Sequence, residues 1–270
     1  VAVDPVGIRR MLAAGEEADR KKLSVVAGTQ RRHQAAYIET IRRLHDGAIG
    51  EIRAAQCYWN GGQLWYKERE AGWSDDEWMH RDWVNWCWLS GDHVVEQHVH
   101  NVDVINWVLK AHPVKATAMG GRHRRVTGDQ FDFFCADLTY PGEIHVHSEC
   151  RQINGCVNNV SERVIGQKGW SDCKEFISTV GKVEVQGQSP YVQEHADLIA
   201  AIRTGRQINE TRDVTESTMS NIMIRQAAYT GKEVTWDELL KSDLQLARPD
   251  YELTPENIRA PIPVPGSDKK

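Results

Sequence analysis

The sequence lacks several signatures that would assign a chemistry at once. No G-x-G-x-x-G turn follows an expected strand, no P-loop is present, and no G-x-S-x-G nucleophile elbow occurs. These absences exclude a dinucleotide site built by this chain alone, a P-loop nucleotide site and an α/β-hydrolase triad. The six cysteines contain no C-x-x-C pair, and a chain of 270 residues needs no disulfide framework to hold its fold, so we expect reduced thiols.

Long apolar runs and an excess of basic residues are also missing. No run approaches the roughly eighteen apolar residues of a membrane-spanning helix, so we expect no membrane partner. Lys and Arg number 33 against 38 Asp and Glu, and the basic residues are scattered, which argues against a nucleic-acid partner. The start at Val1 has neither a basic nor an apolar leader segment. We therefore expect a cytoplasmic protein. The alternative, an export signal that was removed upstream of Val1, is also kept.

Helix and strand signals predict an α+β fold, with an open, mostly antiparallel β-sheet and flanking helices. Asp4 and Pro5 form a helix start, and Tyr140-Pro141-Gly142-Glu143 has the residues of a type II turn in a hairpin. Expected helices cover 5–22, 34–46, 93–110, 191–204, 214–229 and 236–241, and expected strands cover 24–30, 51–59, 131–140, 143–150, 158–166 and 182–186. Residues 60–90 are rich in Trp and are expected to be a packed loop, whereas the Pro-rich tail at 246–270 is expected to extend over a neighbouring surface.

The first candidate site lies in the expected helix 93–110. His93, Glu96, His100 and Asp103 are spaced to form one polar stripe, opposite a stripe of valines. A carboxylate and an imidazole on one helix face can move a proton, for example at a sugar hydroxyl. The same stripe is also typical of a solvated face with local pairing only. Zinc ligation is a further alternative, but no H-E-x-x-H or other closed ligand set supports it, so our main interpretation includes no metal.

A second candidate site lies on the expected strand 143–150. Alternation places His145, His147 and Glu149 on one face, and Arg151 follows, where a guanidinium can clamp a carboxylate or a diol. This face is either the wet side of an open sheet or the wall of a ligand site.

Two weaker candidates complete the set. Arg32 stands where the first expected strand meets a helix, a common position for sites in α/β proteins. Tyr191 and His195 begin a later helix, where such side chains are more often simply exposed. We keep all three as candidate substrate-binding residues, together with His93, His147 and Arg151.

At these residues the chain resembles the Gfo/Idh/MocA family of oxidoreductases, over nearly its whole length. The resemblance rests on the segments 28–32, 47–52 and 227–232 with Trp236, and on Glu96 and His100, which stand where the family has an Asp and a His four residues apart. It implies that Glu96 and His100 are the substrate-orienting and acid/base pair. Glu in place of Asp lengthens the reach of the carboxylate.

The resemblance also implies a domain organisation. Family members begin with a Rossmann domain, and its fingerprint is missing from this chain, so 1–23 are expected to be a remnant helix of that domain. Residues 24–245 would form the substrate and oligomerisation domain with its C-terminal helices, followed by the tail at 246–270. Some helices would then pack on an absent Rossmann domain.

Three functions are expected, in order of preference. The first is the substrate-binding and catalytic portion of an NAD(P)-dependent oxidoreductase acting on a sugar, inositol or polyol. In this portion His100 takes the hydroxyl proton, no NAD or NADP binds tightly, and dehydrogenase activity is absent. The second is a cofactor-independent hydrolase or lyase with a metal held by Glu96, His98, His100, His145 and His147. The third is a binding or oligomerisation module, since the resemblance implies homo-oligomers formed through the sheet face.

Overall fold

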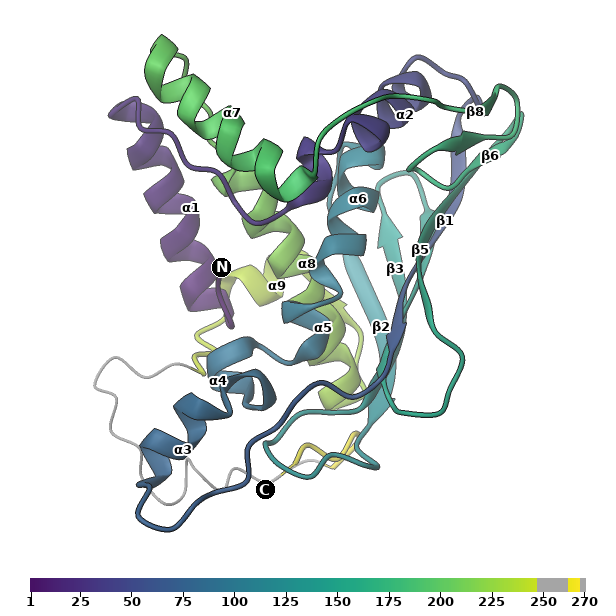
Figure 1. Cartoon of the computed structure of the whole chain (residues 1–270). Helices are drawn as coiled ribbons and strands as arrows, with labels where there is room; N and C mark the ends of the chain where they lie inside the picture. Colours follow the sequence, from purple (N-terminus) through teal and green to yellow (C-terminus); the bar gives the residue numbers. More distant parts are fainter. Residues whose placement is uncertain (247–261, 268–270) are drawn as a thin grey trace.

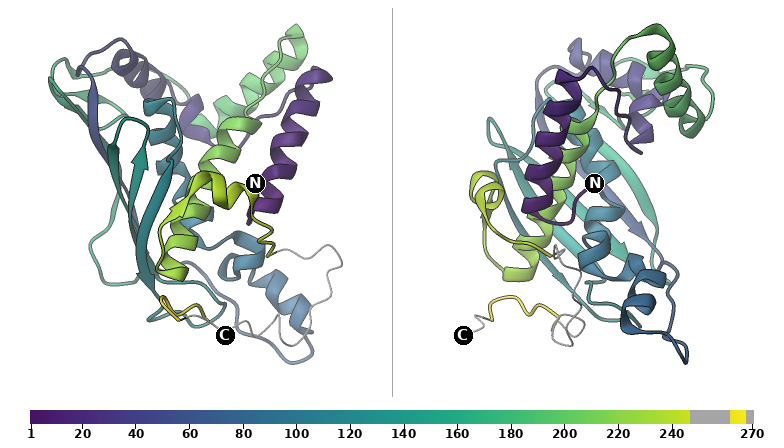
Figure 2. Two further views of the ribbon diagram at one scale, coloured as in Figure 1. Left: turned by 180° about the vertical axis from the view of Figure 1, so that it is seen from behind. Right: turned by 90° about the vertical axis from the view of Figure 1, so that its left-hand side faces the viewer.

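The computed structural model describes residues 1–246 and 262–267, which form a sheet with helices packed on one of its faces (Figure 1). Views from two further sides show the opposite face of the sheet without a covering helix of the described chain (Figure 2). The fold therefore has a covered face, which contains the core, and an open outer face. This agrees with the predicted α+β class.

The described residues form a nine-stranded sheet with the order β8-β7-β6-β5-β1-β4-β3-β2-β9. All its neighbours pair antiparallel except β1 and β4, which run parallel at the centre. The strands are β1 (Ile52–Gly61), β2 (Lys115–Gly121), β3 (Phe133–Tyr140), β4 (Ile144–Gln152), β5 (Asn159–Gly166), β6 (Trp170–Ser171), β7 (Phe176–Ile177), β8 (Gly181–Lys182) and β9 (Val234–Thr235).

Helix α8 (Thr211–Thr230) is the central helix, and most of its side chains are buried. Helix α1 (Pro5–Arg20) packs along it, and Asn209 just before α8 donates a 2.9 Å hydrogen bond to the carbonyl of Gly15. Arg9 of α1 also donates a 2.7 Å hydrogen bond to the carbonyl of Leu240 in the C-terminal helix. The remaining helices are η1 (Gln30–His33), α2 (Ala35–His45), α3 (Asp75–Arg81), η2 (Trp83–Asn85), α4 (Cys87–Ser90), α5 (His93–Glu96), α6 (Val99–Leu109), α7 (Pro190–Thr204) and α9 (Trp236–Lys241).

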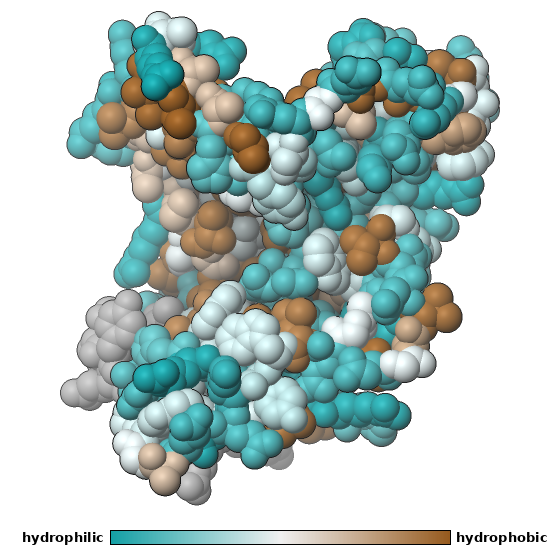
Figure 3. All heavy atoms as spheres, viewed as in Figure 1, coloured by the Kyte–Doolittle hydropathy of each residue, from teal (hydrophilic) through white to brown (hydrophobic). Residues whose placement is uncertain are grey.

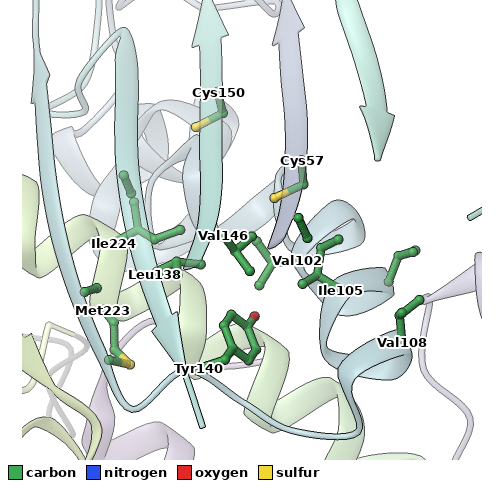
Figure 4. Close-up of a cluster of buried hydrophobic side chains, with 14 of the residues drawn as sticks. Cys57, Val102, Ile105, Val108, Leu138, Tyr140, Val146, Cys150, Met223 and Ile224 are labelled. Atoms are coloured by element: carbon green, nitrogen blue, oxygen red, sulfur yellow. The ribbon is translucent and has the colours of Figure 1, made fainter. Parts of the chain in front are cut away.

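The core lies where α6 and α8 meet the inner face of the sheet (Figure 4). The inner face is apolar because side chains alternate along each strand, so that every second residue points toward the helices. Polar contacts also cross this core, among them a 2.6 Å hydrogen bond from the Tyr140 hydroxyl to Asn106 Oδ1. The labelled residues come from the sheet (Cys57, Leu138, Tyr140, Val146, Cys150), from α6 (Val102, Ile105, Val108) and from α8 (Met223, Ile224).

Several element predictions are confirmed. Helix α1 begins at Pro5, α7 and α8 are followed by Gly205 and Gly231 with positive φ, and the β3–β4 hairpin forms with Gly142 at φ 78°. These elements have local start and stop signals, which need no distant partner to act.

Four element predictions are wrong. Residues 60–90 are not a loop throughout, because they contain α3, η2 and α4. The segment 24–30 is not a strand, because its only ladder contact is a single bridge between Val25 and Asn209, and a 3-10 helix starts at Gln30. Only Lys182 of the expected strand 182–186 is paired in the sheet. The expected helix 93–110 is interrupted between α5 and α6, where the His98 side chain turns inward to bond with Ser148 on the sheet.

Helix α7 projects from the body of the fold and exposes apolar side chains at Val192, Ile199 and Ile202. Figure 3 shows hydrophobic side chains gathered in this region of the surface. The expectation that some helices pack on a Rossmann domain, and the boundary between 1–23 and 24–245, stay predictions. Most of the predicted tail at 246–270 lies outside the described residues, although Gly266 donates a 3.2 Å hydrogen bond to the carbonyl of Thr230. Among the helices described, none has the length and apolarity to span a membrane.

Two glycines with similar backbones give a matched test of the packing. Gly128 (φ 73°) has the carbonyl oxygen of Asn85 only 1.8 Å from where a Cβ would stand, whereas Gly142 (φ 78°) has nothing within 4 Å. Gly142→Ala should therefore lower the free energy of unfolding by about 1–2 kcal/mol, the usual cost of a left-handed backbone. Gly128→Ala adds a backbone clash and should lower it by several kcal/mol more. Urea unfolding measures both, and equal losses would contradict the close approach of the 128 loop to Asn85.

Candidate active site

A cavity of about 410 Å³ opens between the N-terminal segment, the segment before η1, the α4–α5 region and α8. Its volume lies within the range of small-molecule sites. Glu96 and His100, the pair singled out from the family resemblance, both line it. The other lining residues are Val1, Ala2, Val3, Gly28, Thr29, Trp83, Leu89, Ser90, Val95, Val99, Val214 and Thr218.

Glu96 and His100 share this cavity although the helix between them is interrupted. No hydrogen bond or ion pair joins them in the described part of the chain. Glu96 Oε2 instead accepts a 2.8 Å hydrogen bond from its neighbour Gln97, and the His100 ring lies 5.7 Å from that of Trp59 between centroids. The two side chains are therefore separate polar groups facing one space, and each is available to a ligand.

His100 is held in its neutral form. Burial, and then the charge of Arg31, lowers the pKa of His100 from its ordinary 6.5 to about 4. Its Nδ1 is buried and has no hydrogen-bond partner within the described residues, and the same holds for Thr29 Oγ1 in the wall of the cavity. Buried polar atoms without partners are rare, and both atoms belong to residues that line the cavity.

Arg31 is fixed behind His100 by a buried carboxylate. Glu162 accepts hydrogen bonds of 2.5 Å from Arg31, 3.0 Å from Tyr37 and 2.5 Å from Asn101. Burial raises the pKa of Glu162, and the Arg31 charge and the hydrogen bonds oppose that rise. The Arg31 guanidinium also lies 5.8 Å from the Trp59 ring centroid. The cation is thereby held close enough to add to the effect of burial, which is the larger cause of the lowered pKa of His100.

The predicted substrate ligand His93 lies instead in a buried network next to the cavity. Its side chain is 1% exposed, and its Nδ1 is 2.8 Å from Asp92 Oδ1. Asp92 has φ 80° and ψ 157°, a strained backbone for a non-glycine residue, and its Oδ2 accepts hydrogen bonds from the Tyr229 hydroxyl (2.5 Å) and the Phe131 amide (3.1 Å). These partners hold the strained turn that starts α5. The contacts of His93 therefore stabilise this turn and do not face the cavity. The single polar stripe predicted from His93 to Asp103 is therefore wrong.

Other predicted substrate residues lie at different places. Arg32 pairs with Asp103, with Nε 2.9 Å from Oδ2, and lines a separate cavity of about 280 Å³ with Asp213. Tyr191 faces another cavity, of about 270 Å³, and its hydroxyl accepts a 3.4 Å hydrogen bond from Gln30. The structure brings none of these side chains to the cavity of Glu96 and His100.

His195 does not line that cavity either. Its side chain is largely exposed, and its Nδ1 lies 2.8 Å from the carbonyl oxygen of Tyr191. The small cavity that it lines shares Gly28 with the cavity of Glu96 and His100.

His147 and Arg151 point to the outer face of the sheet. His147 Nε2 lies 2.8 Å from Glu149 Oε1, and Arg151 donates a hydrogen bond to the carbonyl of Val157. His98, by contrast, contacts Ser148, whose side chain is buried on the inner face. His145 and His147 are thus separated by the sheet from Glu96, His98 and His100. The alternative five-residue metal set is not assembled, because adjacent strand residues point to opposite faces.

Sequence reasoning missed most of the cavity wall. Trp83 had a partial signal, since it belongs to the Trp-rich segment predicted to be packed, and its ring lies 6.2 Å from that of Trp65. Val214 and Thr218 had no sequence signal, because their positions on α8 have the pattern of an ordinary helix interior. Residues 1–3 reach the cavity only through the packing of α1 on α8.

Comparisons with known proteins agree on the fold. The model of the GFO/IDH/MocA C-terminal domain matches residues 37–171. No curated protein matches the sequence. Among solved structures, an aldose-aldose oxidoreductase from Caulobacter crescentus, complexed with glycerol, is 20% identical with a TM-score of 0.67, covering 87% of this chain and 69% of that one.

Two further structures are similar to the same extent. A putative myo-inositol dehydrogenase from Sinorhizobium meliloti 1021 has a TM-score of 0.62 at 15% identity, covering 84% of this chain and 70% of that one. GenD2 from gentamicin A biosynthesis, in complex with NAD, has a TM-score of 0.66 at 14% identity, covering 86% and 68%. At these identities the likeness shows a shared fold.

The buried His98 predicts how stability depends on pH. Burial lowers the pKa of His98 from 6.5 to about 3. Between these values the unfolded chain binds a proton at this side chain and the folded chain does not, so stability is lost as pH falls through that window. Each such histidine contributes about 1.4 kcal/mol per pH unit. Urea unfolding at pH 6, 5 and 4 gives the slope of the free energy of unfolding against pH. In His98→Gln this slope should be smaller by about this amount.

The exposed His195 is the control for this measurement. His195→Gln should keep the slope of the original protein. Equal slopes in His98→Gln and the original protein would show that His98 is protonated in the folded state.

Proposed function

Because the chain belongs to the GFO/IDH/MocA family, whose C-terminal domain matches residues 37–171, we propose that it forms the substrate side of an NAD(P)-dependent oxidoreductase. The substrate we propose is a sugar, an inositol or a related polyol. The similar structures include an aldose-aldose oxidoreductase complexed with glycerol and a putative myo-inositol dehydrogenase, which supports this substrate class. The observation that carries the proposal is one cavity lined by Glu96, by a neutral His100 and by Thr29.

The cavity has complementary groups for a polyol. Glu96 accepts hydrogen bonds from one or two hydroxyls, and Thr29 Oγ1 can donate or accept one. Trp83 presents an aromatic ring at the wall, which suits the C–H side of a sugar ring. Polar groups at few positions and apolar contact elsewhere are the usual composition of a small-molecule site.

His100 is the residue that we propose to take the proton of the reacting hydroxyl. Its lowered pKa keeps the imidazole uncharged from pH 5 to 8, and only the uncharged ring accepts a hydroxyl hydrogen bond. Glu96 would hold the same or a neighbouring hydroxyl in position. The pair therefore orients the alcohol, with the neutral His100 ring placed to accept the hydrogen bond of its hydroxyl.

The residues of this chain do not fit a dinucleotide by themselves. A Rossmann site needs a parallel strand that leads through a Gly-rich turn into a helix. Among the described strands only β1 and β4 pair in parallel, and neither leads directly into a helix. We therefore assign no step of hydride transfer to these residues, and we propose that the 270-residue chain binds the polyol without binding NAD or NADP tightly.

Calorimetric titration with myo-inositol and with D-glucose tests this proposal. We expect saturable binding of at least one of them, and a loss of about tenfold in affinity in His100→Ala and in Glu96→Ala, the effect of one hydrogen bond of roughly 1.4 kcal/mol. Trp83→Ala should also weaken binding. His145→Ala, on the outer face of the sheet, is the matched control and should bind as the original chain does.

Three results would count against this function. They are the absence of binding by either probe, equal affinity in all four variants, and tight binding of NAD or NADP seen by fluorescence titration of the same chain. The last result would show that the substrate side and the dinucleotide side are not divided as proposed.

We also propose that the outer face of the sheet joins copies of this chain into a homo-oligomer. Met119, Phe133 and Ile165 are 68%, 38% and 38% exposed on this face, and open antiparallel sheets bury such residues in partner contacts.

Light scattering tests the association. We expect an oligomer, and Met119→Asp combined with Phe133→Asp should shift it toward monomer because charged groups would be buried at the contact. Ile202→Asp, on the exposed side of α7, should leave the mass unchanged. A monomeric original chain, or dissociation caused by Ile202→Asp alone, would refute association through the sheet.

A further inference from the structure

Three side chains of different chemistry converge on the outer face of the sheet. Cys135 on β3 stands directly opposite Glu149 on β4, and His147 is two residues before Glu149. Residues i and i+2 of a strand share a face, and a cross-strand partner stands beside them, so this pattern brings three side chains together without a loop. One ligand atom from each lies within 4.8 Å of the other two.

The donor set points to a particular class of ion. A thiol sulfur, an imidazole nitrogen and a carboxylate oxygen are the ligands of zinc and of similar transition metals, whereas calcium and magnesium prefer oxygen alone. With bonds of about 2.0–2.3 Å, two ligand atoms on a tetrahedral zinc lie roughly 3.5 Å apart. Side-chain rotations that contract the present group by about 1 Å would therefore complete the coordination.

The surroundings of the three side chains favour a cation. Asn60 donates a 3.1 Å hydrogen bond to Glu149 Oε2, which fixes the carboxylate, while Oε1 lies 2.8 Å from His147 Nε2. Asp137 stands opposite His147 in the hairpin, and its carboxylate is paired with His145. An outer partner that orients a ligand carboxylate is a common feature of metal sites.

We propose that Cys135, His147 and Glu149 bind a zinc ion on the outer face of the sheet, with the fourth position taken by water. On binding, the Cys135 thiol loses its proton to solvent as the zinc–sulfur bond forms, and the ion links β3 to β4. All three ligands come from one chain, and the sheet separates them from the cavity of Glu96 and His100. The site therefore does not depend on the proposed oxidoreductase function. It lies on the face that we propose to join copies of the chain, where Met119 stands directly opposite Cys135.

Titration of the metal-free chain with Zn²⁺, in competition with a chromophoric chelator, tests the site. We expect one zinc ion per chain, with affinity at least tenfold lower in Cys135→Ser and in His147→Ala. Cys156→Ser and His145→Ala are matched controls, since Cys156 is an exposed thiol outside the group and His145 pairs with Asp137 at 2.8 Å. Both should keep the original affinity.

Two further measurements make the outcome decisive. Co²⁺ in place of zinc should give a thiolate-to-metal charge-transfer absorption that is lost in Cys135→Ser and kept in Cys156→Ser. Zn²⁺ should raise the melting temperature of the original chain and of Cys156→Ser, but not of Cys135→Ser, because only the folded site binds it. No competition with the chelator, equal affinity in all variants, or loss of binding in Cys156→Ser would each overturn the proposal.

Discussion

The hydrogen-bonded ion pair between Glu162 and Arg31 is the contact on which the candidate site depends. Glu162 stands on β5 and faces inward, where it is 4% exposed, and its partners come from η1, α2 and α6. One carboxylate thus connects the sheet to three helical elements. A buried charge of this kind is tolerated only when it is paired and its remaining acceptor positions are filled, and here three donors fill them.

The electrostatics of the cavity follow from that pair. Arg31 is balanced by Glu162, so its charge is stable in a buried place, and it still lies near enough to His100 to disfavour a second positive charge. Burial is the larger cause of the lowered pKa of His100 and this charge adds to it, so the imidazole stays neutral without any direct contact with Glu96. This explains how two residues that are not bonded to each other can both be available to a ligand.

The sequence indicated the elements better than it indicated the site. Helix ends marked by Pro5, Gly205 and Gly231 were predicted, because a proline or a glycine acts through its own backbone. The interruption before α6 was not predicted, because it depends on a hydrogen bond between His98 and Ser148, fifty positions away. Helical spacing alone placed His93 and Asp103 beside Glu96, and both are buried in other networks. The family resemblance singled out Glu96 and His100 only, and these are the two that share a cavity.

The parallel pairing of β1 with β4 has a consequence for how the chain reaches this fold. Ala54 aligns with His145, so the middle of the sheet is closed by segments that are distant in sequence, with β2, β3 and α3 to α6 between them. Local hairpins such as β3–β4 can form early, but β1 has no sheet neighbour until β4 and β5 have been synthesised. A ribosome-bound chain must therefore carry an unpaired, largely apolar strand for some time, and high contact order of this kind is associated with slow folding.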